Sequence, residues 1–254
     1  MTGAAVPRGP EDILWYEGPA AYLCAPHCGT EAADHDRGAW RRGVALGAVG
    51  RYAEAAAVLG PLIHTHESGS LALSTLASHA RQVGRHQEAA DLDGRALELA
   101  RTDEDRADAT SGLVADALGQ GDAPGAVALV RSARAAAHGW RGTTRLHWVA
   151  AELALLRDLP DEAVAEAQRA VDTAQQAAAP RHVTKSTLVR GVARKVAGDA
   201  PGAHSDLLDA LTRAEDQGLP TLDWPAAAVL AELEPAFTDK ARSALVTVID
   251  GLGE

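Results

Sequence analysis

The sequence predicts an all-α fold, a solenoid of about six antiparallel helix pairs. The first observation is a recurring phrase, which reads GRYAEA from residue 50, GRHQEA from 84, DLPDEA from 158, and GDAPGA from both 121 and 198. The second is its spacing, because the first three copies begin 34 and 37 residues apart, a period typical of stacked repeats. The third is that apolar residues flank each phrase at helical spacing and do not alternate as in a strand.

The chemistry of the phrase predicts a tight turn between two helices. A glycine can close the first helix because it adopts a left-handed conformation without a Cβ penalty. The proline that follows in three copies suits the first turn of the next helix, where its fixed φ is tolerated and no donor is lost. We expect the Asp or Arg after the glycine to be solvated. Each unit is therefore predicted to be helix, short turn, helix.

The elements follow in order along the chain. Residues 1–37 contain an aromatic segment at 11–23, interrupted at Gly18 and Pro19, and then a loop. Residues 38–216 are predicted to hold five hairpins, at about 38–65, 70–100, 105–138, 143–178 and 182–216. Residues 217–254 are expected to form capping helices, because terminal repeats have one face toward water.

Small side chains recur where two helices of a hairpin would approach closely. Five positions after the start of the phrase stand Ala55, Ala89, Ala126, Ala163 and Ala203. A small residue also recurs seven positions later in most copies and seven positions before the break. This arrangement resembles the tetratricopeptide repeat (TPR) family over roughly residues 38–215. The resemblance implies a right-handed superhelix with a concave face formed by the first helix of each pair.

The sequence departs from that family in three respects. The aromatic residue of the first helix is present only as Trp40 and Trp148, and the tyrosine later in that helix is replaced in every copy. Most copies lack the proline that closes a unit. Around Asp158 we expect one extra residue. The chain is therefore interpreted as a diverged repeat array.

Composition and charge disfavour several classes of partner. The formal net charge is −11 and the pI is about 5.3, which disfavours nucleic acid because binding its backbone needs a positive surface, and likewise disfavours anionic membranes. The beginning of the chain has no basic segment followed by an apolar one, and no apolar run reaches the roughly 20 residues needed to cross a bilayer. A cytoplasmic protein is expected, and the alanine- and arginine-rich composition is typical of high-GC bacteria.

One loop contains the residue types of a metal site. Cys24, His27 and Cys28, with His35 nearby, supply thiolates and imidazoles of the kind that bind zinc. Their spacing is not a common zinc-finger spacing and there is no second cysteine pair, so two incidental cysteines are the preferred interpretation. A disulfide is disfavoured in a reducing compartment. We predict no cofactor and no metal.

The TPR resemblance implies that exposed positions on the first helices line a ligand groove. Carried over position by position, the groove residues are Arg37, Trp40, Ser74, Ser78, Arg81, Ser111, Arg145, Trp148, Glu152, Lys185 and Lys195. More of these are basic than acidic, so an acidic or carboxylate-ended peptide is one expected ligand. The alternative for the two tryptophans is a place in the core between repeats. We also expect that changing Arg81, Arg145 and Lys195 to Glu leaves stability nearly unchanged.

These observations predict a non-enzymatic, protein-interaction adaptor that binds a peptide or helix of a protein partner in its concave groove. One alternative is a regulatory protein that senses a small molecule or peptide and acts in trans. Another is a metal-dependent enzyme that uses the Cys24, His27 and Cys28 loop. The aromatic N-terminal segment is expected to fold into its own groove or into a second copy, which is compatible with a homodimer.

Overall fold

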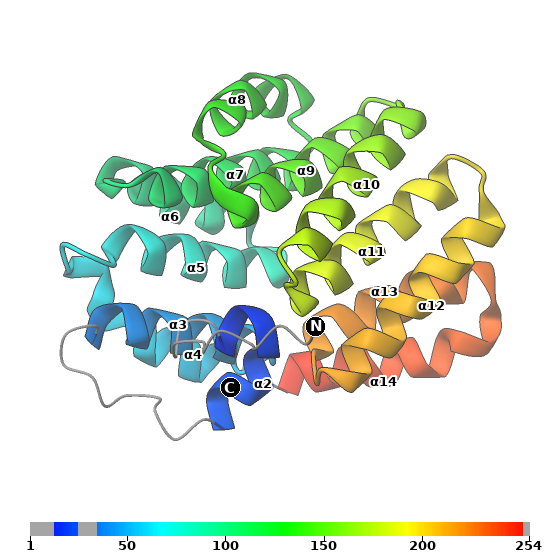
Figure 1. The fold of residues 1–254 in the computed structure, drawn as a ribbon, viewed down its shortest axis with the longest axis horizontal. Coiled ribbons are helices and arrows are strands. Elements are labelled where there is room, and N and C mark those ends of the chain that lie inside the picture. The colour runs from blue at the N-terminus through cyan, green and yellow to red at the C-terminus, as the bar shows by residue number, and fades with distance from the viewer. Residues whose placement is uncertain (1–12, 25–34, 251–254) are drawn as a thin grey trace, which may run out of the picture.

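A computed structural model describes residues 13–24 and 35–250, and within these ranges the regular elements are all helices (Figure 1). Twelve of the helices form six consecutive antiparallel pairs. The pairs are α3 (His35–Ala48) with α4 (Tyr52–Leu59), α5 (Gly69–Gln82) with α6 (His86–Leu99), α7 (Asp103–Gly119) with α8 (Ala123–Ala136), α9 (Gly139–Leu156) with α10 (Pro160–Gln176), α11 (Pro180–Val196) with α12 (Ala200–Asp216), and α13 (Pro220–Leu233) with α14 (Thr238–Asp250).

Shorter helical segments complete the fold. The N-terminal segment consists of a π-helical turn η1 (Ile13–Glu17) and a short helix α2 (Pro19–Cys24), separated at Gly18 as the sequence predicts. Two 3₁₀ turns, η3 (Gly60–His64) and η4 (Pro235–Phe237), lie after α4 and before α14. The five predicted hairpins and the two C-terminal helices are present, with ends that differ from the predicted ones by a few residues.

The turns between paired helices adopt the predicted geometry. Gly50, Gly84, Gly121 and Gly198 have φ between 74° and 83°. The amide after each glycine donates to a carbonyl five residues earlier, as in Arg51 N to Leu46 O (2.9 Å), which satisfies a carbonyl at the helix end. Asp158 takes the glycine position with φ 57°, so the extra residue expected there is absent.

The aspartates after two of these glycines are not simply solvated, which corrects the expectation. Asp122 and Asp199 accept hydrogen bonds from the backbone N–H of Gly125 (2.9 Å) and Gly202 (3.0 Å). Each carboxylate thereby caps the start of the next helix, because the first N–H groups of a helix have no partner within it.

Close contact within each hairpin rests on the predicted small residues. The five alanines that follow the turns are fully buried, with no exposed surface. Gly43 serves the same purpose on the first helix, since a Cβ there would lie 2.5 Å from the Leu59 side chain. Side chains this small let two backbones approach, and the buried area of each is modest, so stability comes from many such contacts.

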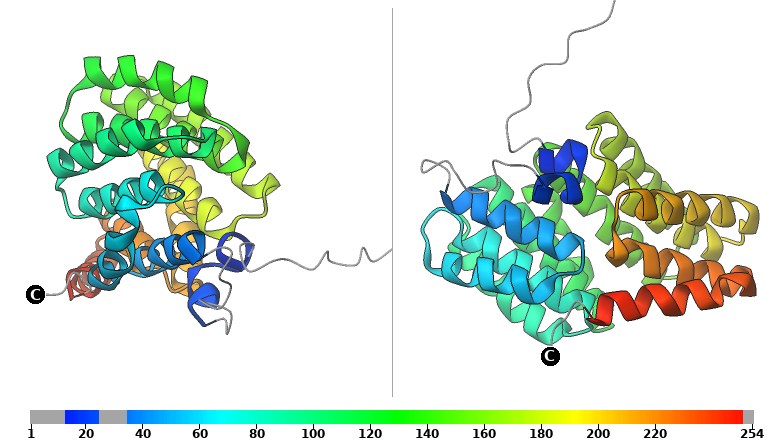
Figure 2. Two further views of the ribbon diagram at one scale, coloured as in Figure 1. Left: turned by 90° about the vertical axis from the view of Figure 1, so that its left-hand side faces the viewer. Right: turned by 90° about the horizontal axis from the view of Figure 1, so that it is seen from below.

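The array curves until its first and last pairs meet (Figures 1 and 2). The Thr221 hydroxyl on α13 donates a buried hydrogen bond of 2.8 Å to the Ala48 carbonyl at the end of α3. Ala48 also belongs to one apolar cluster with Leu188, Leu222 and Leu230. The six first helices therefore surround a common interior.

Two glycine substitutions test the close-contact model. Gly94→Ala on α6 adds a Cβ that meets nothing within 4 Å, so we expect it to raise the free energy of unfolding by about 1 kcal/mol through helix propensity. Gly43→Ala adds the same atom against Leu59 and should lower that free energy by about 1–3 kcal/mol through overpacking. Urea denaturation measures both, and a stabilising Gly43→Ala would contradict the model.

Candidate functional site

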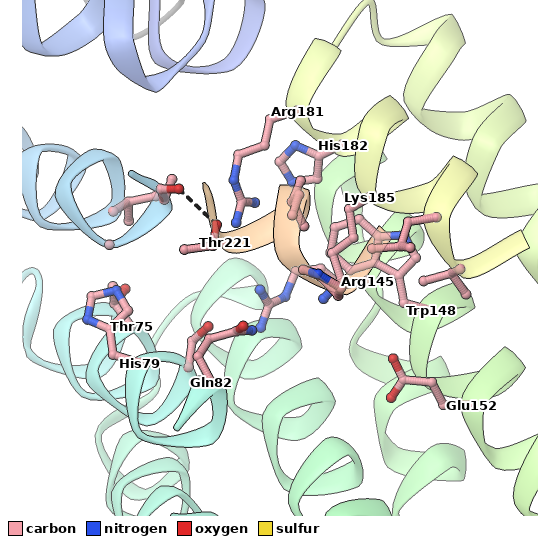
Figure 3. A pocket seen from close by; sticks show the side chains of 18 of the residues that line it. Thr75, His79, Gln82, Arg145, Trp148, Glu152, Arg181, His182, Lys185 and Thr221 are labelled. Carbon is pink, nitrogen blue, oxygen red and sulfur yellow. Dashed lines mark hydrogen bonds between the residues drawn. The ribbon is translucent and has the colours of Figure 1, made fainter. Parts of the chain in front are cut away.

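The interior of the solenoid holds a cavity of about 330 Å³. Side chains from the first helices of the repeats line it, and Figure 3 shows Thr75 and His79 on one side and Lys185 and Trp148 on the other. Polar and apolar groups are mixed in its wall. A concave cavity with a few convergent polar groups is typical of a ligand site.

A second cavity of about 540 Å³ adjoins the first. Seven residues line both: Ser78, Gln82, Arg145, Trp148, Glu152, Leu155 and Lys185. The second cavity extends between α5, α7 and α9 and also touches His86 at the start of α6. The two cavities therefore form a longer channel with a shared central wall.

The N-terminal segment contributes Trp15 to the wall of the first cavity. Its ring lies 6.2 Å from the Trp40 ring and 5.9 Å from the His182 ring, measured between centroids, and the Arg141 guanidinium lies 5.2 Å from its centroid. The segment thus packs on the interior of its own chain, which is the first of the two expected alternatives.

Two arginines on the cavity walls form ion pairs with carboxylates of neighbouring helices. Arg81 forms ion pairs with Asp93 (2.5 Å) and Asp116 (2.7 Å), whose side chains are each 1% exposed. Burial raises the pKa of Asp93 to about 7, an effect that the Arg81 charge partly offsets. Arg141 pairs with Asp108 (2.5 Å) and Glu104 (3.1 Å). These pairs join α5, α6, α7 and α9.

Three other cationic side chains face the cavity and form fewer ion pairs with described residues than Arg81 and Arg141. The Arg145 Nε lies 3.3 Å from an oxygen of Asp108, which Arg141 also engages. Arg181 forms no hydrogen bond or ion pair with any residue that the structure describes, and its buried Nε has no partner. Lys185 lies with its Nζ 4.3 Å from the Trp148 ring centroid, a cation–π contact.

Neutral histidines complete the wall. His182 is 3% exposed and stacks on Trp148 at 5.4 Å between centroids. Burial and the nearby charges of Arg181, Arg141, Arg145 and Lys185 hold the pKa of His182 well below its usual range. His79 packs against Tyr52 at 5.1 Å, and burial lowers the His79 pKa to about 4. Both rings are therefore uncharged at neutral pH.

Most of the groove residues predicted from the sequence lie on these walls. The lining of the two cavities includes Ser74, Ser78, Arg81, Ser111, Arg145, Trp148, Glu152 and Lys185. Trp148 is also part of the core, where its Nε1 donates to the Ser186 Oγ at 2.8 Å.

Three predicted residues lie elsewhere. Trp40 is 1% exposed, belongs to the core and donates from Nε1 to the Thr75 Oγ1 at 2.9 Å. Arg37 pairs with Glu104 at 2.8 Å, and Lys195 pairs with Glu232. None of the three is among the lining residues of either cavity.

The sequence did not point to several residues that the structure brings into the interior. They are Tyr52, His79, Arg141, Arg181, His182, Thr221 and Trp224. Arg141 and Arg181 stand one helical turn before Arg145 and Lys185, on the same face, so extending that face by four residues would have found them. Tyr52, Thr221 and Trp224 enter only because the first and last pairs meet.

Of the predicted metal candidates, only His35 has a described side chain. His27, Cys28 and the side chain of Cys24 lie outside the described residues, and His35 is exposed beside Asp36. Within residues 13–24 and 35–250 no group of three His, Cys, Asp or Glu side chains is placed to hold a metal ion.

Comparison with known proteins identifies the fold. No protein-family model and no curated protein matches the sequence. Among solved structures, a Rap protein complexed with competence and sporulation factor superposes with a TM-score of 0.64 at 13% identity, over 85% of this chain and 64% of that one. A chain of the APC/C hetero-tetramer Cut9–Hcn1 gives a TM-score of 0.59 at 14% identity, over 93% of this chain and 51% of that one. The chain has a TPR-like helical-repeat fold. It spans about half to two thirds of the length of these neighbours.

The length and apolar character of a helix determine whether it can span a membrane. In the part of the chain that the structure describes, no helix combines the length and the apolar character required to span a bilayer.

The Arg81 cluster corrects the expectation that Arg81 can be changed without loss of stability. Arg81→Met leaves Asp93 and Asp116 buried without their cation, and we expect the free energy of unfolding to fall by about 3–5 kcal/mol. Arg85→Met, at an exposed pair with Glu88, should change it by less than about 1 kcal/mol. Guanidinium denaturation compares the two, and equal effects would show that the buried cluster is not stabilising.

Burial of His182 predicts a dependence of stability on pH. The unfolded chain takes up a proton at this residue below about pH 6.5 and the folded chain does not. The wild type should therefore lose about 1.4 kcal/mol of unfolding free energy per pH unit, between pH 6 and 5, relative to His182→Phe. Denaturation curves at several pH values measure this difference, and parallel pH profiles for the two proteins would contradict it.

Proposed function

We propose that this chain is a non-enzymatic binding module that holds a short segment of a protein partner, or a short peptide, in its interior channel. The observation that carries this proposal is the pair of adjoining cavities, of about 330 and 540 Å³, lined by the first helices of the repeats. Together they have the size of a peptide of a few residues, whereas a long partner helix would need an open groove.

Two further findings support an interaction scaffold. Both superposed neighbours are solved as complexes, one of a Rap protein with competence and sporulation factor and the other of Cut9 with Hcn1. The wall also offers both anchors of a peptide site, an aromatic surface at Trp148 and charged groups at Arg145 and Glu152. An adaptor or regulator in the bacterial cytoplasm is the role that we propose for it.

A specific observation favours a second candidate, a sensor of a small molecule that acts in trans. The Thr221–Ala48 hydrogen bond closes the array on itself, and Trp15 covers part of the first cavity. A ligand must therefore fit inside a nearly complete ring, which favours a small ligand over a large one.

The test uses a bulky residue that fills the channel. Ser78 lines both cavities, so Ser78→Trp should block them, and Ser243→Trp on the exposed surface of α14 is the matched control. In equilibrium dialysis against a synthetic hexapeptide library, read by mass spectrometry, the wild type and Ser243→Trp should retain the same peptides. We expect Ser78→Trp to retain at least tenfold less, provided that its circular dichroism is unchanged.

Two results would overturn the peptide proposal. Equal retention by Ser78→Trp would place peptide binding outside the interior, and no retention by the wild type would remove peptides as the ligand class. If dialysis against a mixture of metabolites then yields a compound retained by the wild type but lost in Ser78→Trp, the sensor is supported instead.

A further inference from the structure

The interior carries more positive than negative charge, although the chain as a whole has a net charge of −11. Four cationic side chains line the first cavity, namely Arg141, Arg145, Arg181 and Lys185, against two acidic ones, Asp108 and Glu152. The two histidines of the wall are uncharged at neutral pH. The excess of positive charge therefore belongs to this cavity and not to the chain as a whole.

Asp108 does not compensate these cations fully. Its Oδ2 binds Arg141 at 2.5 Å, and its Oδ1 lies 3.3 Å from the Arg145 Nε without the alignment of a hydrogen bond. One carboxylate thus faces two guanidinium groups from adjacent turns of α9. Arg141 has a second acidic partner in Glu104, whereas no second ion pair of Arg145 is present among the described residues.

Arg181 is the least compensated cation of the wall. It projects into the cavity from the first turn of α11 (Figure 3), and it makes no ion pair within residues 13–24 and 35–250. Burial, with Arg145 nearby, lowers the pKa of Arg181 to about 10, and burial also lowers the pKa of Lys185 to about 8. Both shifts reflect the cost of holding a cation away from water, which for Lys185 the nearby Glu152 charge offsets only in part.

Other groups around Arg181 suit an organic anion. The Tyr52 hydroxyl is buried without a hydrogen-bond partner, and burial raises its pKa to about 12, so that it remains a donor. Apolar side chains line the same cavity: Val44, Leu188, Val192, Trp224 and Val229. Cations and an apolar wall in one cavity match a ligand with an anionic head and an apolar body.

We infer that Arg181 and Arg145 form an oxyanion subsite that binds the carboxylate of an amphipathic ligand, with Lys185 completing the positive field. The guanidinium groups supply paired N–H donors of the geometry that a carboxylate accepts. The inference rests on the proposed function, because it names the chemistry of the ligand in the same interior. The carboxylate belongs either to the C-terminus of a short peptide or to a free organic acid.

Hexanoate is the first probe, because it has one carboxylate and a flexible apolar body. Its binding is followed by tryptophan fluorescence at constant ionic strength, with 1-hexanol as the uncharged analogue. We expect saturable binding of hexanoate by the wild type, and binding of 1-hexanol at least tenfold weaker. Saturation by hexanol at the same concentration, or no saturation by hexanoate, would overturn the subsite.

Variants assign the effect to Arg181. Arg181→Met should weaken hexanoate at least tenfold and leave hexanol unchanged, whereas Arg131→Met, on the exposed surface of α8, should behave as the wild type. Without ligand, Arg181→Met should melt no lower than the wild type, because it removes a buried cation that has no partner. A lower melting temperature would mean that Arg181 has a structural role, and unchanged hexanoate binding would exclude it as the anion contact.

Lys185→Met gives a second measure of the same subsite, should Arg181→Met not fold. We expect a smaller loss of hexanoate binding, since Lys185 contributes positive potential but no fixed pair of N–H donors.

The proposed carboxylate subsite and the proposed binding module can fail independently of each other. If the hexapeptides bind inside the channel and hexanoate does not, the subsite is wrong and the binding module stands. Hexapeptides with free and amidated C-termini distinguish the two sources of the carboxylate, since only the free form should bind a peptide-directed subsite.

Discussion

Closure of the solenoid on itself is the constraint on which the interior depends. The Thr221 hydroxyl and the Ala48 carbonyl form one buried hydrogen bond between the last and first pairs, and Ala48 joins the apolar cluster around Leu222 and Leu230. A buried carbonyl that lost this partner would be costly. Because the ends meet, groups on α4, α5 and α13 face groups on α9 and α11, and a concave surface becomes a set of cavities.

Arginine side chains in the interior have two kinds of surroundings: within the described part of the chain, some are ion-paired with buried carboxylates and others are not. Arg81 is enclosed by two carboxylates and connects α5, α6 and α7, so its charge is used within the fold. Arg181 lies in the same interior and has no such partner among the described residues. Side chains of the same type are therefore ion-paired within the fold at one position and, among the described residues, not at another, and only their neighbours distinguish them.

The N-terminal segment contributes Trp15 to an aromatic cluster at the candidate site. Trp15, Trp140 and Trp148 surround His182, with ring centroids 4.8–5.9 Å from the imidazole. This packing excludes water from one end of the first cavity and keeps the imidazole neutral. A dry wall strengthens the electrostatic influence of the nearby arginines, because charges interact more strongly at low effective dielectric constant. The aromatic cluster and the cationic side chains thus border the same cavity.

The sequence by itself determined the hairpins and their turns, because these depend on neighbours close in the chain: the glycine at Gly50 or Gly198 and the alanine five residues later at Ala55 or Ala203. The TPR resemblance, carried over position by position, also predicted residues such as Arg145 on the inner face. The tertiary structure alone decided that Trp40 is core, that Arg81 is enclosed, and that the ends of the array meet. The physical reason is that small rotations between successive pairs accumulate, and their sum sets contacts between residues up to 173 positions apart.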